Sequence, residues 1–138
     1  MTPLAIKRLS RDLQNHEYNI NENNIVNLQY KNYNLSFYLN EDYPFKPPFV
    51  YINNKLISYR YLYFPHKIFQ LYIDSGHNCP CCENLSCHGK WSPVFTVLNI
   101  IDEYKLVITN MVRFYKKYIT SFIPNLPDDI LGIIMEYI

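Results

Sequence analysis

A long stretch of alternating residues limits most strongly what this chain can fold into. From Ile25 to Leu39, hydrophobic side chains recur at every second position, as expected for strands with one buried face. Lys31 and Asn32 interrupt the alternation and predict a turn between the two halves. The pattern therefore predicts two antiparallel strands joined by a tight hairpin.

A proline-rich turn follows this stretch directly. The sequence from Tyr43 to Pro48 reads YPFKPP, and a residue that precedes proline is kept out of the α-helical region. Tyr43 and Lys46 are thereby held extended, and the regular strand cannot continue through the turn. A further strand is predicted from Phe49 to Ile52, so the consecutive strands indicate an antiparallel meander.

Helices are predicted on both sides of this meander. Thr2 and Pro3 provide an N-cap and a first-turn proline, and an apolar stripe follows on one side of the helix at Ile6, Leu9 and Leu13. A long second helix is predicted to begin near Ser92, with its buried face formed by Val97, Ile100, Ile101, Tyr104, Val107 and Ile108.

The segment from Leu56 to Ile73 is aromatic and predicts a strand hairpin broken at Pro65. Pro124 and Pro127 end the long helix, and a last helix is predicted from Asp128. The order of elements is a helix, a meander, an irregular cysteine-rich segment and further helices. This order predicts the α+β fold class.

Composition excludes several classes of function. The chain has 138 residues, of which 49% are hydrophobic and 18% charged, as expected for one folded domain. A net charge of +1 does not favour nucleic acid as a partner. The longest apolar runs are short, and the opening residues MTPLAIKRLS lack the apolar stretch of a signal peptide, so we expect neither a membrane span nor export. The four cysteines are then better interpreted as thiols or metal ligands than as disulfides.

The proline turn, a downstream cysteine and then Trp91-Ser92-Pro93 at the start of a helix together resemble the ubiquitin-conjugating (E2) family. The resemblance covers roughly residues 3–110 and implies a UBC-like domain over residues 1–123. Residues 124–138 resemble the opening helix of an F-box but are too short for an F-box domain, so we interpret them as a docking helix. The sequence bias toward Asn, Ile, Tyr and Lys is typical of an A/T-rich genome and suggests a viral member of the family.

The resemblance implies a transferase whose cysteine carries ubiquitin as a thioester and passes it to a lysine amine. Two adjacent cysteines are candidates for this nucleophile. If Cys81 is aligned with the family's catalytic cysteine, the stretch that it begins, CCENL, matches the family's catalytic turn better. If Cys82 is aligned instead, fewer extra residues are needed before Trp91. The family's His-Pro-Asn stretch is absent, and Asn78 or Asn84 is the candidate donor to the oxyanion. This chemistry requires no cofactor.

The clustering of the cysteines also suggests a structural zinc site. Cys79 and Cys82 form a C-x-x-C pair, and Cys87 with His88 or His77 would complete four ligands. Such a site would leave Cys81 as the nucleophile. The alternative is that the neighbouring cysteines bind no metal.

The resemblance also implies partners: ubiquitin or a similar modifier, an activating enzyme (E1) and a ligase (E3). The residues that would contact a ligase are Phe45, Lys46, Ser92 and Pro93. Those that would contact the activating enzyme are Lys7, Arg8 and Arg11, although such bases can also form a simple solvated helix face. We expect a cytoplasmic or nuclear protein, located in the host cell if it is viral.

A second function remains open at this point. The missing His-Pro-Asn stretch favours a non-catalytic E2-like binding module, in which the cysteines hold zinc or pack against their neighbours. Exposure of the cysteine discriminates between the two functions, since a nucleophile must lie at an accessible rim and zinc ligands must converge.

Overall fold

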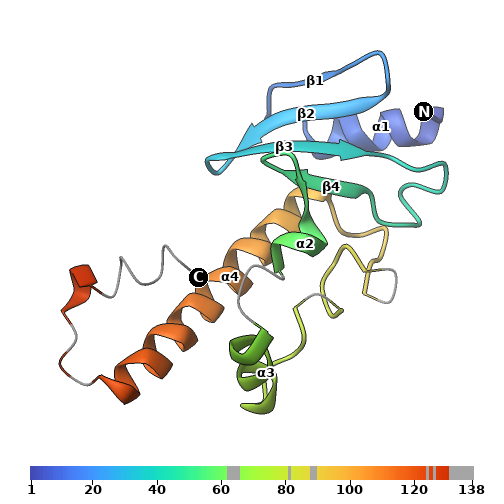
Figure 1. Cartoon of the computed structure of the whole chain (residues 1–138). Helices are drawn as coiled ribbons and strands as arrows, with labels where there is room; N and C mark the ends of the chain where they lie inside the picture. Colours follow the sequence, from blue (N-terminus) through green and yellow to red (C-terminus); the bar gives the residue numbers. More distant parts are fainter. Residues whose placement is uncertain (62–65, 81, 88–89, 124, 126, 131–138) are drawn as a thin grey trace.

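The computed structural model has an α+β architecture with an N-terminal helix, a five-stranded antiparallel meander and further helices, of which the last is long (Figure 1). This confirms the predicted fold class. The structure describes residues 1–61, 66–80, 82–87, 90–123, 125 and 127–130.

The sheet follows chain order, and every neighbouring pair of strands is antiparallel. Its strands are β1 (Tyr18–Ile20), β2 (Ile25–Tyr30), β3 (Tyr33–Tyr38), β4 (Phe49–Ile52) and β5 (Lys55–Leu56). The three strands predicted from alternation are confirmed as β2, β3 and β4. The strands β1 and β5 have three and two residues, too few to show a period, and were not predicted.

One face of the sheet is buried and the other is open. Val26, Phe37 and Val50 lie in register on β2, β3 and β4 and are each 0% exposed. The opposite face carries Tyr38 and Phe49, which are paired across strands and about half exposed. Among the described residues, the helices therefore cover one side of the sheet and leave the other open.

Helix α1 (Pro3–Asp12) begins as predicted: the Thr2 hydroxyl accepts a hydrogen bond from the Ala5 amide at 3.1 Å. Its buried positions are Ala5, Leu9 and Leu13, spaced by four residues. The expected burial of Ile6 is wrong, because this side chain lies to one side of that row and is 48% exposed.

The predicted hairpin between Leu56 and Ile73 is wrong. Among the described residues of this range, only β5 is extended, and the others form the short helix α2 (Ile57–Tyr61) and the helix α3 (His66–Asp74). Pro65, the predicted break, lies outside the described residues.

Burial explains why these segments are helical. The buried residues of α2 are Ile57 and Tyr61, four apart, and those of α3 are Phe69 and Tyr72, three apart. This is the spacing of one helix face. Aromatic residues favour strands in general, but here their tertiary contacts outweigh that preference.

The long helix α4 runs Val97–Phe122. Its predicted start near Ser92 is wrong, because Thr96 and Asn99 form a reciprocal capping box that begins the helix five residues later. Within the described ranges, no helix is both long and apolar enough to cross a membrane.

Helix α4 joins two hydrophobic clusters (Figure 1). Its first half packs under the sheet beside α1, through Val97, Ile100, Ile101 and Tyr104. Its second half extends beyond the sheet and packs against α3, through Met111 and Tyr115 against Phe69 and Tyr72. The predicted inward face of α4 is thus confirmed over its first half.

Residues 128–130 are helical, close to the predicted start of the last helix, and residues 131–138 lie outside the described part. The docking role of residues 124–138 and the domain boundary at residue 123 stay predictions.

Two neighbouring residues of β4 allow a test of which face of the sheet is buried. Ile52 is 0% exposed and Tyr51 is 39% exposed on the opposite face. We expect Ile52→Ala to lower the free energy of unfolding by about 2–5 kcal/mol, because it leaves a cavity in the core. Tyr51→Ala should cost about 1 kcal/mol or less. Urea denaturation measures both, and equal losses would contradict the assigned faces.

Candidate functional site

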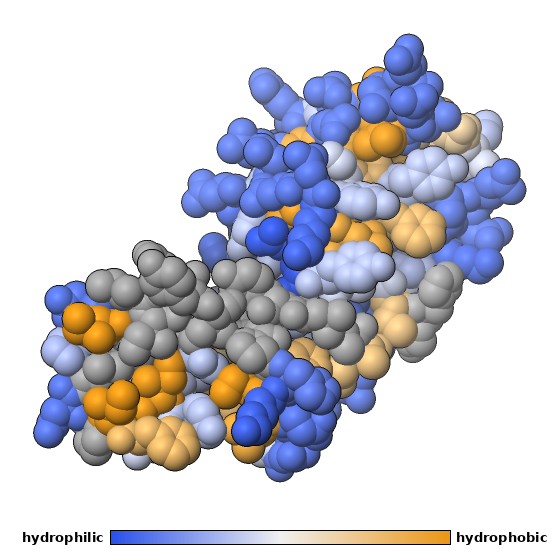
Figure 2. All heavy atoms as spheres, viewed as in Figure 1, coloured by the Kyte–Doolittle hydropathy of each residue, from blue (hydrophilic) through white to orange (hydrophobic). Residues whose placement is uncertain are grey.

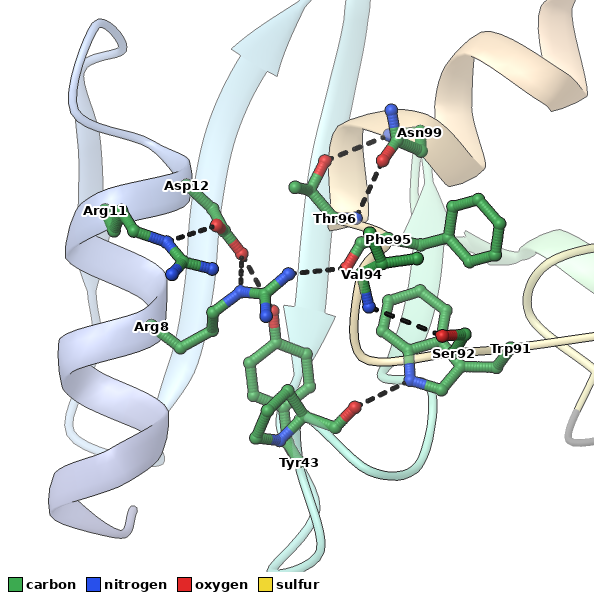
Figure 3. A network of polar contacts seen from close by, with 11 residues as sticks. Arg8, Arg11, Asp12, Tyr43, Trp91, Ser92, Val94, Phe95, Thr96 and Asn99 are labelled. Atoms are coloured by element: carbon green, nitrogen blue, oxygen red, sulfur yellow. Dashed lines mark hydrogen bonds and ion pairs between the residues drawn. The ribbon is translucent and has the colours of Figure 1, made fainter.

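The two proline motifs meet through the single tryptophan of the chain. Trp91 is 8% exposed, and its indole nitrogen donates a hydrogen bond to the carbonyl oxygen of Pro44 at 2.8 Å (Figure 3). The Trp91 ring also lies 6.4 Å from the ring of Tyr43, which precedes Pro44 across a cis peptide bond. Residues 47 positions apart in sequence are thus joined in one buried contact.

An ionic network connects this contact to α1. The guanidinium of Arg8 lies 2.6 Å from the carboxylate of Asp12 and donates to the carbonyl oxygen of Phe95 at 2.9 Å (Figure 3). The side chains of Arg8 and Asp12 are only 11% and 5% exposed. Since Phe95 lies just before α4, this network holds the N-terminal helix against the segment that follows Trp91.

Tyr43 completes the network from the side of the proline turn. Burial, together with the nearby Asp12 carboxylate, raises the pKa of Tyr43 to about 12. The hydroxyl therefore stays protonated at neutral pH and donates to Asp12 at 3.5 Å. The proline turn, α1 and the loop before α4 therefore meet at the Arg8–Asp12 pair.

The basic residues predicted to contact an activating enzyme have different surroundings. Lys7 and Arg11 are exposed, but most of Arg8 is buried in the network with Asp12. All three nevertheless line one open pocket of about 410 Å³, together with Leu4 and Pro44. Arg8 thus has a structural role that its position in the sequence did not reveal.

The residues predicted to contact a ligase lie on both sides of the Trp91–Pro44 contact. Phe45 directly follows Pro44 and is 68% exposed, and the neighbouring Lys46 is paired with Asp42 at 2.8 Å. Ser92 and Pro93 directly follow Trp91 and are half-buried. The contact therefore brings both predicted groups to one corner of the molecule.

Sequence reasoning missed two exposed hydrophobic side chains at this corner. Val94, which follows Pro93, is 75% exposed, and Leu4 in the pocket beside Pro44 is 52% exposed. No periodic pattern identified them, because Val94 was assigned to a helix and Leu4 lies off the apolar stripe of α1. Exposed apolar side chains beside basic ones suit a protein-binding surface.

The cysteine segment is a series of short hydrogen-bonded turns. The amides of Cys82 and Glu83 donate to the carbonyl oxygen of Cys79 at 3.3 and 2.9 Å. At the other end, the Trp91 amide donates to the carbonyl oxygen of Cys87 at 3.1 Å. These bonds connect the described residues of the segment, which include few apolar side chains.

Asn84 stabilises the middle of the segment. It is 2% exposed, and its amide donates to the carbonyl oxygen of Pro80 at 2.7 Å. Its side-chain oxygen accepts hydrogen bonds from the amide and the hydroxyl of Ser86. The adjacent Leu85 amide donates to the carboxylate of Glu103 on α4 at 2.8 Å. This geometry favours a structural role for Asn84 over the predicted role of oxyanion donor.

Of the two candidate nucleophiles, the structure describes Cys82 but not Cys81. Cys82 is exposed at a turn, and Cys79 and Cys87 are half-buried, whereas Cys81 lies outside the described residues. The candidate donor Asn78 is exposed. An exposed thiol on a hydrogen-bonded turn is accessible to a carbonyl substrate, which a nucleophilic cysteine requires.

The predicted zinc site stays a prediction. Within the part of the chain that the structure describes, no three histidine, cysteine or acidic side chains are arranged to hold a metal ion. His88 lies outside the described residues. The ring of His77 stacks on that of Tyr72 at 4.1 Å and contacts the edge of Phe114, so it packs against α3 and α4.

Comparisons with family models, curated proteins and solved structures found no match for the chain. The resemblance to ubiquitin-conjugating enzymes therefore rests on the two proline motifs, the cysteine segment and their order along the sequence.

The unequal burial of two arginines leads to a stability prediction. Arg8→Met leaves the buried Asp12 with Arg11, whose side chain is 67% exposed, and with the 3.5 Å hydrogen bond from the Tyr43 hydroxyl. We expect this change to lower the free energy of unfolding by about 2–4 kcal/mol, because a buried carboxylate loses its main partner. The matched control Arg11→Met should cost about 1 kcal/mol or less. Urea denaturation distinguishes the two; similar losses would argue against the Arg8 network.

Proposed function

We propose that this chain is a divergent ubiquitin-conjugating enzyme with a UBC-like fold. The observation that carries the proposal is the buried hydrogen bond from Trp91 to Pro44. It joins the two motifs on which the family resemblance rests: a buried indole N–H needs an acceptor, and here the acceptor belongs to the other motif. The order of helix, antiparallel meander, cysteine segment and long helix supports the same assignment.

The proposed reaction has two steps. The cysteine thiolate attacks the thioester carbonyl of ubiquitin on the activating enzyme, and that enzyme's cysteine leaves as a thiolate. A lysine amine then attacks the new thioester, forms an amide bond and releases the cysteine of this chain. Cys82 is the first candidate because it is exposed, and Cys81 is the alternative. Asn78, exposed two residues before Pro80, is the remaining amide candidate for the oxyanion.

The corner around Trp91 is the proposed docking surface of the enzyme. Lys7, Arg11 and the exposed Leu4 would contact the activating enzyme at the pocket beside Pro44. Phe45 and Val94 would contact the ligase, with Ser92 and Pro93 between them. Arg8 contributes indirectly, since its burial positions α1 against this corner.

One observation favours the second function, a non-catalytic E2-like binding module. The amide of Asn84 is buried inside the cysteine segment and already donates to Pro80. A chain without a usable amide would stabilise the oxyanion poorly, and removing such a donor costs on the order of 100-fold or more in rate. The docking surface would then serve to bind ligase or modifier alone.

A charging assay tests the proposal. The protein is mixed with activating enzyme, ATP and ubiquitin, and the products are separated on gels with and without reductant. We expect an adduct that reductant removes, because a thioester exchanges with thiols. Cys82→Ala should abolish the adduct.

The matched control is Cys87→Ala, which removes a half-buried thiol from the same segment and should leave the adduct in place. Loss with Cys81→Ala instead would identify Cys81 as the nucleophile. The absence of an adduct with several activating enzymes and modifiers would contradict catalysis and favour the binding module.

A further inference from the structure

After Glu103, the charged residues on the exposed side of α4 are all basic. These residues, which we call the basic face of α4, are Lys105, Arg113, Lys116 and Lys117. Between residues 104 and 123 the chain contains no acidic residue, although its overall net charge is only +1. The net charge of the whole chain therefore does not reveal the local excess of positive charge on this part of α4.

Helical spacing places these bases together. Lys105, Arg113 and Lys117 follow one another at multiples of four residues, opposite the buried side chains of Met111 and Tyr115. At 1.5 Å per residue, the basic face extends for about 18 Å along the helix. Three of the four bases are grouped at residues 113–117, and Lys105 lies about 12 Å before them along the helix.

The bases of this face differ from most others in the chain in having no acidic partner among the described residues. Elsewhere, the basic side chains with an acidic group within 4 Å are Arg8, Arg11, Lys31, Lys46 and Lys90. The helix dipole does not account for the basic face either, because the last turn of α4 contains no base and the dipole effect is confined to that turn.

The overall charge of the chain and the exposed hydrophobic area near these bases determine which kind of anionic partner fits the surface. Nucleic-acid-binding domains usually have a pI above about 9, whereas the pI of this chain is about 7.6, so the rest of the molecule would repel a polyanion. A membrane would need a continuous apolar face to insert, but Leu106 is the large hydrophobic side chain exposed among these bases. Phe122 and Ile123 are also exposed, but they lie at the C-terminal end of α4, where Figure 2 shows hydrophobic side chains beside hydrophilic ones.

We propose that the basic face of α4 binds an acidic segment of another protein. Carboxylates of that segment would pair with the four bases, and an apolar side chain would cover Leu106, which is 62% exposed. Three of the four bases of this surface, Arg113, Lys116 and Lys117, lie on the second half of α4, beyond the part that packs under the sheet. The proposed binding does not depend on cysteine chemistry.

Fluorescence anisotropy of a labelled acidic peptide tests the proposal. The probe is a glutamate-rich peptide of about eight residues with one central leucine, long enough when extended to follow the basic face. We expect binding to weaken about tenfold between about 50 and about 300 mM salt, since exposed charges are screened. The same peptide with glutamine in place of glutamate should not bind.

Charge reversal locates the surface. Arg113→Glu combined with Lys117→Glu should weaken binding by about tenfold or more. The control is Lys55→Glu combined with Lys67→Glu, which changes the net charge equally at two exposed residues outside α4 and should have little effect. Circular dichroism confirms that both variants are folded.

Several results would overturn the proposal. The glutamate peptide could fail to bind more tightly than its glutamine counterpart, or both double variants could weaken binding equally. Tighter binding of duplex DNA would assign the face to nucleic acid. Self-association that is lost in the α4 variant would assign it to a second copy of this chain.

Discussion

The hydrogen bond between the Trp91 indole and the Pro44 carbonyl is the interaction on which the rest of the structure depends. Both groups are buried, and leaving either without its partner would cost about 1–3 kcal/mol. The bond closes a loop that contains the end of the sheet, α2, α3 and the whole cysteine segment. It therefore determines where the candidate nucleophile lies relative to the sheet.

Two further contacts support this arrangement. Arg8 connects α1 to the loop before α4, and the Glu103 carboxylate accepts a hydrogen bond from the Leu85 amide inside the cysteine segment. The segment is thus supported by the proline turn at one end and by α4 at its middle. Under the proposed function, these contacts would help to position the exposed Cys82 thiol for the transfer reaction.

Periodicity predicted the parts of the fold in which burial is local. The strands β2, β3 and β4 and the start of α1 follow from alternation and from the Thr2 cap. The helices α2 and α3 could not be predicted in this way, because their buried aromatic residues contact distant parts of the chain. The inward orientation of Arg8 was equally invisible, since it depends on Asp12 and on a carbonyl 87 residues away. For the site, sequence alone indicated which motifs matter, but only the structure shows that Asn84 is used inside its own turn.

Hydrogen exchange at the indole of Trp91 tests the central claim most directly. The chain has one tryptophan, so its indole N–H gives a single assignable NMR signal. We expect this proton to exchange at least about 100-fold more slowly than in a free indole, because it is buried and donates to Pro44. Exchange at the rate of free indole would show that the two proline motifs do not meet, and would contradict both the fold of this corner and the function built on it.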